Sequence, residues 1–181
     1  IKTFREISDN VGTNAIAWRY DPIFITDKYD LDFHIDKFED IASRLNGYTH
    51  DCTISFIDLY QKVIRNFPEA DEVTVEEQLV IGENFARIAR ENDIKIKTCL
   101  EGTLLDQFGC DSSGCMTQQV IEKAIGNNLK LPKGKYQNRE CNCIFGRDIG
   151  AYNTCMHGCK YCYANSNMKL VKKNQKLHNP D

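Results

Sequence analysis

The chain has 181 residues, of which 41% are hydrophobic and 27% are charged, and its formal net charge at pH 7 is −3. These values are typical of a folded domain, and no apolar run approaches the roughly 18 residues that a membrane-spanning helix needs. The first residues lack the charged and then apolar layout of a signal peptide. We therefore expect a cytoplasmic protein that does not enter the membrane.

Short apolar runs alternate with helical patterns over the first hundred residues. In chain order the patterns predict the last turns of a helix over 1–7, a strand over 15–20 that ends at Asp21-Pro22, a helix over 31–45, a strand over 53–57, a helix over about 75–89, a strand over 94–98 and a short helix over 117–125. Thr74 and Glu77 have the spacing of a capping box before the second long helix. His34 lies within the first long helix and is expected to be structural.

Strands that alternate with amphipathic helices indicate an α/β fold with a parallel sheet. Three such units are too few to close a barrel. We expect residues 1–125 to be a partial (β/α) barrel of parallel strands, with the N-terminal part of the barrel missing from this chain. Residues 126–181 are expected to form an irregular, cysteine-rich segment that binds a cluster.

The chain contains nine cysteines, and eight of them follow residue 98. An odd number fits a framework of disulfides poorly, and the crowding points to metal chemistry in the C-terminal half. Cys52 and Cys110 are expected to be ordinary buried thiols.

The densest group is Cys155, Cys159 and Cys162, with the spacing C-x3-C-x2-C. Three thiolates within eight residues can each bind one iron of a cubane 4Fe-4S cluster, which leaves the fourth iron without a protein ligand. An open metal position is one at which a substrate can bind. Gly158 allows a tight turn beside the cluster. A structural zinc site is the alternative, although zinc usually takes paired C-x2-C units.

This spacing, with an aromatic residue before the third cysteine, resembles the motif of the radical S-adenosylmethionine superfamily. The resemblance implies that the open iron binds S-adenosylmethionine and that electron transfer cleaves it to a 5′-deoxyadenosyl radical. It also implies that Tyr161 lies against the adenine. The motif usually follows the first barrel strand in that superfamily, whereas here it follows the last predicted strand.

Three stretches also resemble a bacterial family known as domain of unknown function 1848, whose C-terminal cysteine cluster is similar to the radical enzymes' motif. They are Trp18–Ile23, Asp148–Cys155 and His157–Asn165. Members of that family are longer at the N-terminus, which agrees with a missing part of the barrel. The family has no settled reaction, so the resemblance implies a chemistry without a substrate.

A second set of thiols comprises Cys99, Cys115, Cys141 and Cys143. Four cysteines can complete a closed auxiliary cluster, or hold zinc, or be unrelated thiols, and their spacing does not decide among these. Cys110 is the replacement if one member is wrong.

Polar residues follow the predicted strands where a cofactor lies in parallel α/β folds. Arg19 can pair with the carboxylate of S-adenosylmethionine, and Asp21, Ser55 and Asp58 can contact its hydroxyl groups. Alternatively, Asp21 forms a turn before Pro22 and Asp58 caps a helix. His157, between two cluster ligands, is expected near the cluster or on the surface, and no catalytic residue is assigned.

The leading hypothesis is a radical S-adenosylmethionine enzyme that acts on an unknown substrate and receives electrons from a donor such as ferredoxin or flavodoxin. The alternative is a non-catalytic protein, either an iron–sulfur electron carrier or a zinc-stabilised binding module. Lys169, Lys172, Lys173 and Lys176 suit phosphates such as those of nucleic acid, but the acidic chain favours a solvated tail.

Overall fold

The computed structural model describes residues 1–131, 143–144 and 150–179. The chain forms two compact units. The first comprises residues 1–57 and 71–145, and the second comprises residues 58–70 and 146–181. The boundary expected at residue 125 stays a prediction.

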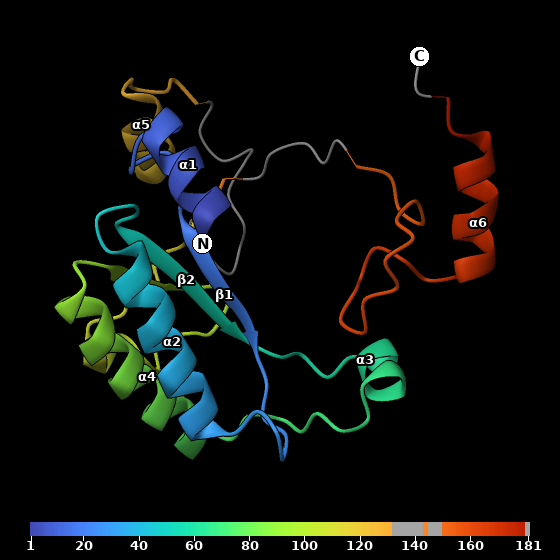
Figure 1. Cartoon of the computed structure of the whole chain (residues 1–181), viewed down its shortest axis with the longest axis horizontal. Helices are drawn as coiled ribbons and strands as arrows, with labels where there is room; N and C mark the ends of the chain where they lie inside the picture. The colour runs from blue at the N-terminus through green and yellow to red at the C-terminus, as the bar shows by residue number, and fades with distance from the viewer. Residues whose placement is uncertain (132–142, 145–149, 180–181) are drawn as a thin grey trace. The chain divides into compact units, whose positions relative to one another are not determined.

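The first unit is built on a parallel sheet of three strands in the order β1-β2-β3. Figure 1 shows β1 and β2 side by side. The strands are β1 (Trp18–Ile23), β2 (Asp51–Phe56) and β3 (Lys95–Thr98). Trp18 pairs with Cys52 and Asp51 pairs with Lys95, so neighbouring strands run in the same direction. The predicted α/β class with a parallel sheet is therefore confirmed.

The predicted bounds of the first strand were wrong. The strand begins at Trp18 and continues through Asp21 and Pro22 to Ile23. The pairing with β2 is irregular between Tyr20 and Ile23, and such an irregularity accepts a proline, which has no N–H to donate to a neighbouring strand. Asp21 is therefore part of the strand, and the alternative that it forms a turn is wrong.

Helices α2 (Leu31–Leu45) and α4 (Val75–Glu91) pack side by side against one face of this sheet (Figure 1). Their contact is aromatic. The rings of Phe38 and Phe85 stack with centroids 3.8 Å apart, and Trp18 and Tyr20 of β1 lie against them. Both phenylalanines are fully buried. The hydrophobic core of this unit therefore lies between the sheet and the two helices.

The opposite face of the sheet is polar because side chains alternate between the two faces along each strand. Trp18, Cys52 and Ile96 are buried on the helix side. Arg19, Asp21 and Ser55 lie on the opposite face, and they interact with one another. This face and the segments that follow the strands hold the chemically reactive side chains of the first unit.

The remaining helices of the first unit are α1 (Lys2–Val11), the short 3₁₀ helix η1 (Asp106–Phe108) and α5 (Gln118–Ile125). The capping box of α4 is confirmed, since Thr74 and Glu77 bond each other's main-chain N–H groups. Thr117 likewise accepts a hydrogen bond from the main chain of Val120 at the start of α5, as expected of an N-cap residue.

His34 of α2 is buried at 4% exposure, and its ring is hydrogen-bonded on both sides. It donates from Nε2 to the Phe24 carbonyl at 2.7 Å and accepts from the Tyr20 hydroxyl at Nδ1, at 2.8 Å. A ring that donates from one nitrogen and accepts at the other is neutral, and burial lowers the pKa of His34. The predicted structural role of His34 is supported by these contacts.

Acidification below about pH 6.5 is expected to destabilise the protein through His34. At these pH values His34 binds a proton in the unfolded chain but stays neutral in the folded one. The free energy of unfolding therefore decreases as the pH is lowered, until the pH reaches the lowered pKa of the folded state. Urea unfolding at pH 7.5 and 5.5 measures this loss, which should be smaller in His34→Gln. An equal loss in both proteins would contradict the prediction.

The second unit contains α3 (Gln61–Asn66) and α6 (Met168–Leu177). The sequence patterns predicted neither helix, and the segment expected as a solvated lysine tail is largely α6. Asn167 caps α6 by accepting hydrogen bonds from the main chain of Lys169 and Leu170. Throughout the part of the chain that the structure describes, no helix is both long enough and apolar enough to cross a membrane.

Candidate metal centre

The three clustered cysteines lie on one loop of the second unit, and Asn153 closes the loop at its base. The Asn153 main-chain N–H donates to the Ala164 carbonyl at 2.9 Å. The Asn153 side-chain oxygen accepts from the main-chain N–H of Ser166, at 2.7 Å, and of Asn167, at 3.2 Å. Asn153 has a φ of 58°, in the left-handed region that asparagine tolerates. We call residues 153–167 the cysteine loop.

Side chains of α3 and α6 hold this loop through its main-chain oxygens. Lys62 of α3 donates from Nζ to the carbonyl of Cys162 at 2.6 Å and to the carbonyl of Asn165. Asn174 of α6 donates to the carbonyl of Asn153 at 3.0 Å. Within the loop, Asn165 donates from its amide to the carbonyl of Cys155 at 2.6 Å. These contacts fix the backbone on both sides of the cysteines.

The cysteine side chains face solvent to different degrees. Cys155 and Cys159 are exposed, and Cys162 is half-buried. Gly158, between the first two, has a φ of 66°, a conformation that glycine adopts without strain. The positive φ suits the glycine expected beside the cluster, and the tight turn there stays a prediction. His157 is exposed on the same loop.

Two buried polar atoms of the second unit have no hydrogen-bond partner within the described residues: the Tyr60 hydroxyl and the side-chain oxygen of Asn165. Asn165 is 6% exposed. The Tyr60 ring lies 5.6 Å from the ring of Tyr161, centroid to centroid, and burial raises the pKa of Tyr60. A buried hydroxyl that stays protonated is a donor available to a group bound nearby.

A family model described as domain of unknown function (DUF1848) matches residues 1–164. The chain belongs to this family. The match covers all nine cysteines and ends two residues after Cys162, before α6. No curated protein and no solved structure matches the chain.

The DUF1848 chain brings three members of its second cysteine set close together in the first unit. Cys99 directly follows β3, and its sulfur accepts a hydrogen bond from the thiol of Cys115. The sulfur atoms of Cys115 and Cys143 lie 3.9 Å apart. The sulfur of Cys143 also accepts the Met116 main-chain N–H at 3.3 Å. Cys141 lies outside the described residues.

The electrostatics of this set favour one thiolate. The hydrogen bond from Cys115 lowers the pKa of Cys99 to about 6, against the effect of burial, and Arg19 lowers it further. The same hydrogen bond raises the pKa of Cys115. A thiolate is the form of cysteine that binds metals. Cys110, by contrast, is buried, and burial raises its pKa to about 11, which makes it a poor replacement ligand.

Arg19, Asp21 and Ser55 form a hydrogen-bonded group beside these thiols. The guanidinium of Arg19 donates to one carboxylate oxygen of Asp21 from Nε at 2.8 Å, and Ser55 donates to the other oxygen at 2.8 Å. Nη1 of Arg19 donates to the sulfur of Cys115 at 3.6 Å. Arg19 thus already pairs with a carboxylate of its own chain, that of Asp21. From the sequence we expected it to pair instead with the carboxylate of S-adenosylmethionine.

Gly114 is the residue that allows Cys143 to approach Cys115. Its φ is 125°, and an added Cβ would lie 3.1 Å from the Cys143 sulfur and 3.3 Å from the Cys143 main-chain nitrogen. We expect Gly114→Ala to destabilise the protein by about 2–4 kcal/mol, because backbone strain and overpacking add. Urea unfolding measures this change.

Gly126→Ala is the matched control for Gly114→Ala. Gly126 also has a positive φ, of 68°, but an added Cβ there would meet nothing within 4 Å. Gly126→Ala should lower the free energy of unfolding only by the backbone strain, about 1–2 kcal/mol. Equal losses in the two variants would contradict the close approach of Cys143.

Asp58 is exposed in the second unit; the N-cap of α3 is Tyr60, so the alternative that Asp58 caps a helix is wrong. Cys52 is fully buried, as predicted. The described residues contain no group of three or more His, Cys, Asp or Glu side chains that could hold a single metal ion. A cubane cluster makes a different demand, because its thiolates bind different irons.

Sequence reasoning missed the residues that hold the cysteine loop, namely Lys62, Asn153 and Asn165. Lys62 is a hundred residues from Cys162 in the sequence, and no local pattern marks it. Asn153 and Asn165 stood within the stretches that carried the family resemblance. An asparagine beside each end of a cysteine motif is the signal that could have found them, because its side chain often bonds nearby backbone.

Proposed function

We propose that the cysteine loop binds a 4Fe-4S cluster through Cys155, Cys159 and Cys162, and that the protein is a radical S-adenosylmethionine enzyme. The observation that carries the proposal is a loop fixed by its main chain while its thiols stay accessible. The hydrogen bonds that hold the loop at Cys155 and Cys162 go to the carbonyl oxygens of these residues. The three sulfur atoms therefore remain available as ligands.

The surroundings of the loop suit an anionic cluster. Three thiolates bring negative charge, and Lys62 places its ammonium group against the carbonyls of Cys162 and Asn165. Positive charge and hydrogen bonds near a cluster help to set its reduction potential. The unpartnered hydroxyl of Tyr60 is a further donor in the same unit. These features support the fit of the loop to the cluster.

The chemistry that the bound, reduced cluster supplies is one-electron cleavage of S-adenosylmethionine. The chain's own residues bind and orient. Cys155, Cys159 and Cys162 supply the ligands, and Lys62 and Asn165 keep the backbone around them in place. Tyr161 is assigned to contact the adenine. The cofactor contacts expected of Arg19, Asp21, Ser55 and Asp58 stay predictions from the sequence. An external donor such as ferredoxin or flavodoxin supplies the electron.

A partial (β/α) barrel is part of the same proposal. Helices α2 and α4 pack on one face of the parallel sheet, and polar side chains gather on the other, as on the outer and inner faces of a barrel. Cys99, Cys115 and Cys143, together with Cys141, are proposed to hold an auxiliary cluster or zinc. The closeness of three of them supports this assignment.

Electron paramagnetic resonance tests the proposal. The full chain is reconstituted without oxygen with iron and sulfide, reduced with dithionite, and measured with and without S-adenosylmethionine. We expect the spectrum of a reduced cluster to change on addition of S-adenosylmethionine, because one iron is open. A cluster spectrum that ignores S-adenosylmethionine would favour the electron carrier. Binding of zinc alone would favour the structural module.

A further inference from the structure

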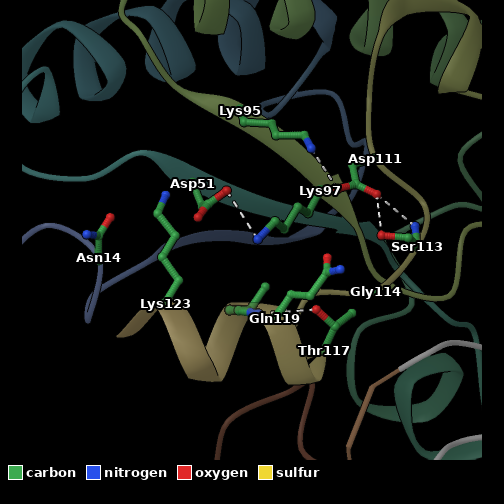
Figure 2. A pocket seen from close by; sticks show the side chains of 11 residues that line it. Asn14, Asp51, Lys95, Lys97, Asp111, Ser113, Gly114, Thr117, Gln119 and Lys123 are labelled. Atoms are coloured by element: carbon green, nitrogen blue, oxygen red, sulfur yellow. Dashed lines mark hydrogen bonds and ion pairs between the residues drawn. The ribbon is translucent and has the colours of Figure 1, made fainter. Parts of the chain in front are cut away.

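A cavity of about 220 Å³ lies in the first unit between β3 and α5. It is separate from the cysteine loop, which belongs to the second unit. Figure 2 shows its side chains, which come from β2, β3, α5 and the loops beside them. The charged ones are Asp51, Lys95, Lys97, Asp111 and Lys123. The cavity is therefore polar, and we call it the lysine pocket.

Lys97 is the most unusual residue of the lysine pocket, because it is a buried cation. The residue is 6% exposed, and its Nζ lies 3.2 Å from a carboxylate oxygen of Asp51. Lysine is rarely buried to this extent without a partner. An ammonium group has three N–H bonds, and the ion pair with Asp51 uses one of them. The others are available to a ligand.

The second pair of charges in the lysine pocket is already satisfied. Lys95 lies 2.9 Å from one oxygen of Asp111. The other oxygen of Asp111 accepts hydrogen bonds from the hydroxyl and the main-chain N–H of Ser113, at 2.5 and 3.0 Å. These bonds and Lys95 lower the pKa of Asp111 to about 2 in spite of burial. Asp111 is therefore ionised, and it neutralises Lys95.

Lys123 supplies the surplus charge. It projects from α5 toward the sheet, on the side of Asp51 (Figure 2). Lys123 has no ion-pair partner among residues 1–131, 143–144 and 150–179. Because Asp51 pairs with Lys97 and Asp111 with Lys95, the lysine pocket keeps one unbalanced positive charge. The amides of Asn14 and Gln119 add neutral hydrogen-bond donors to its lining.

We propose that the lysine pocket binds a small metabolite through a phosphate or carboxylate group held between Lys97 and Lys123. Charge-assisted hydrogen bonds to anionic oxygens are the strong kind, and both lysines can make them. The volume lies below the roughly 300–1,000 Å³ of pockets for drug-sized ligands, so the ligand is small. The site does not depend on the iron–sulfur proposal and can be tested without iron.

Isothermal titration calorimetry on the full chain tests this site at constant ionic strength. Inorganic phosphate probes for a phosphate ligand, succinate probes for a carboxylate ligand, and chloride is the reference anion. We expect saturable binding of phosphate or succinate. Whichever anion binds more tightly identifies the group that the lysine pocket recognises.

Lys123→Ala should weaken the binding of that anion about tenfold or more, because one charge-assisted hydrogen bond is lost. Lys123 is exposed, so this variant should fold normally. Lys37→Ala, on the exposed side of α2, removes the same charge away from the site and should leave the affinity unchanged. Lys97→Met should abolish binding, and its thermal unfolding temperature reports whether it is folded.

Two results would overturn the proposal. One is the absence of saturable binding for both phosphate and succinate in the unmodified chain. The other is an equal loss of affinity in Lys123→Ala and Lys37→Ala, which would mean that the anion responds only to the overall charge of the protein.

Discussion

Replacing Cys159 with alanine is expected to lower the yield of 5′-deoxyadenosine by more than about a hundredfold in the reconstituted, reduced protein. Loss of a residue that supports a metal site costs about 10–100-fold, and loss of one of three ligands should cost more. Cys159 is exposed on the cysteine loop, next to Gly158, so alanine should not disturb the fold. Chromatography after incubation with S-adenosylmethionine and dithionite measures the product.

Met156→Ala is the matched control for Cys159→Ala. Met156 lies on the same loop and is 50% exposed, so its replacement should leave the yield unchanged. Circular dichroism should show the same helix content in both variants. Product formation by Cys159→Ala at the level of the unmodified chain would exclude Cys159 as a ligand, and it would contradict the radical assignment of this loop.

Replacing Phe85 with alanine is expected to destabilise the first unit by about 3–5 kcal/mol, the usual cost of removing a buried aromatic ring. The ring is fully buried, stacks on Phe38 at 3.8 Å and meets the edge of Tyr20 at 5.4 Å. A loss of this size should lower the thermal midpoint by about 10 °C. Thermal and urea unfolding followed by circular dichroism measure it.

Val80→Ala on the same helix is the control for Phe85→Ala. Val80 is 41% exposed, and substitutions at such positions usually change stability by less than about 0.5 kcal/mol. A loss below about 1 kcal/mol in Phe85→Ala would contradict the packing of α2 and α4 through their aromatic rings.

The elements that the sequence predicted well are those whose signals are local. The apolar spacing from Leu31 to Leu45 and the capping pair of Thr74 and Glu77 both describe one helix and its own end. The short helices α3 and α6 were not predicted, because α3 has only 6 residues and α6 carries many lysines. Both helices are stabilised by contacts with the cysteine loop, and a local sequence pattern does not reveal such contacts.

The candidate site divides in the same way. The spacing of Cys155, Cys159 and Cys162 could be read directly, because all three stand within eight residues. The hydrogen bond from Lys62 to Cys162 spans a hundred residues. The approach of Cys143 to Cys115 depends on the unusual backbone of Gly114. Long-range contacts and a single backbone angle leave no periodic trace in a sequence.

The division of the second unit between residues 58–70 and 146–181 has a consequence for biosynthesis. The ribosome releases the segment that contains α3 long before the cysteine loop, with residues 71–145 made in between. Domains tend to fold as units during synthesis, so the first unit can acquire its core while Lys62 still lacks its carbonyl partners. The cysteine loop, and any metal site on it, therefore assembles only after residues 71–145 have been made.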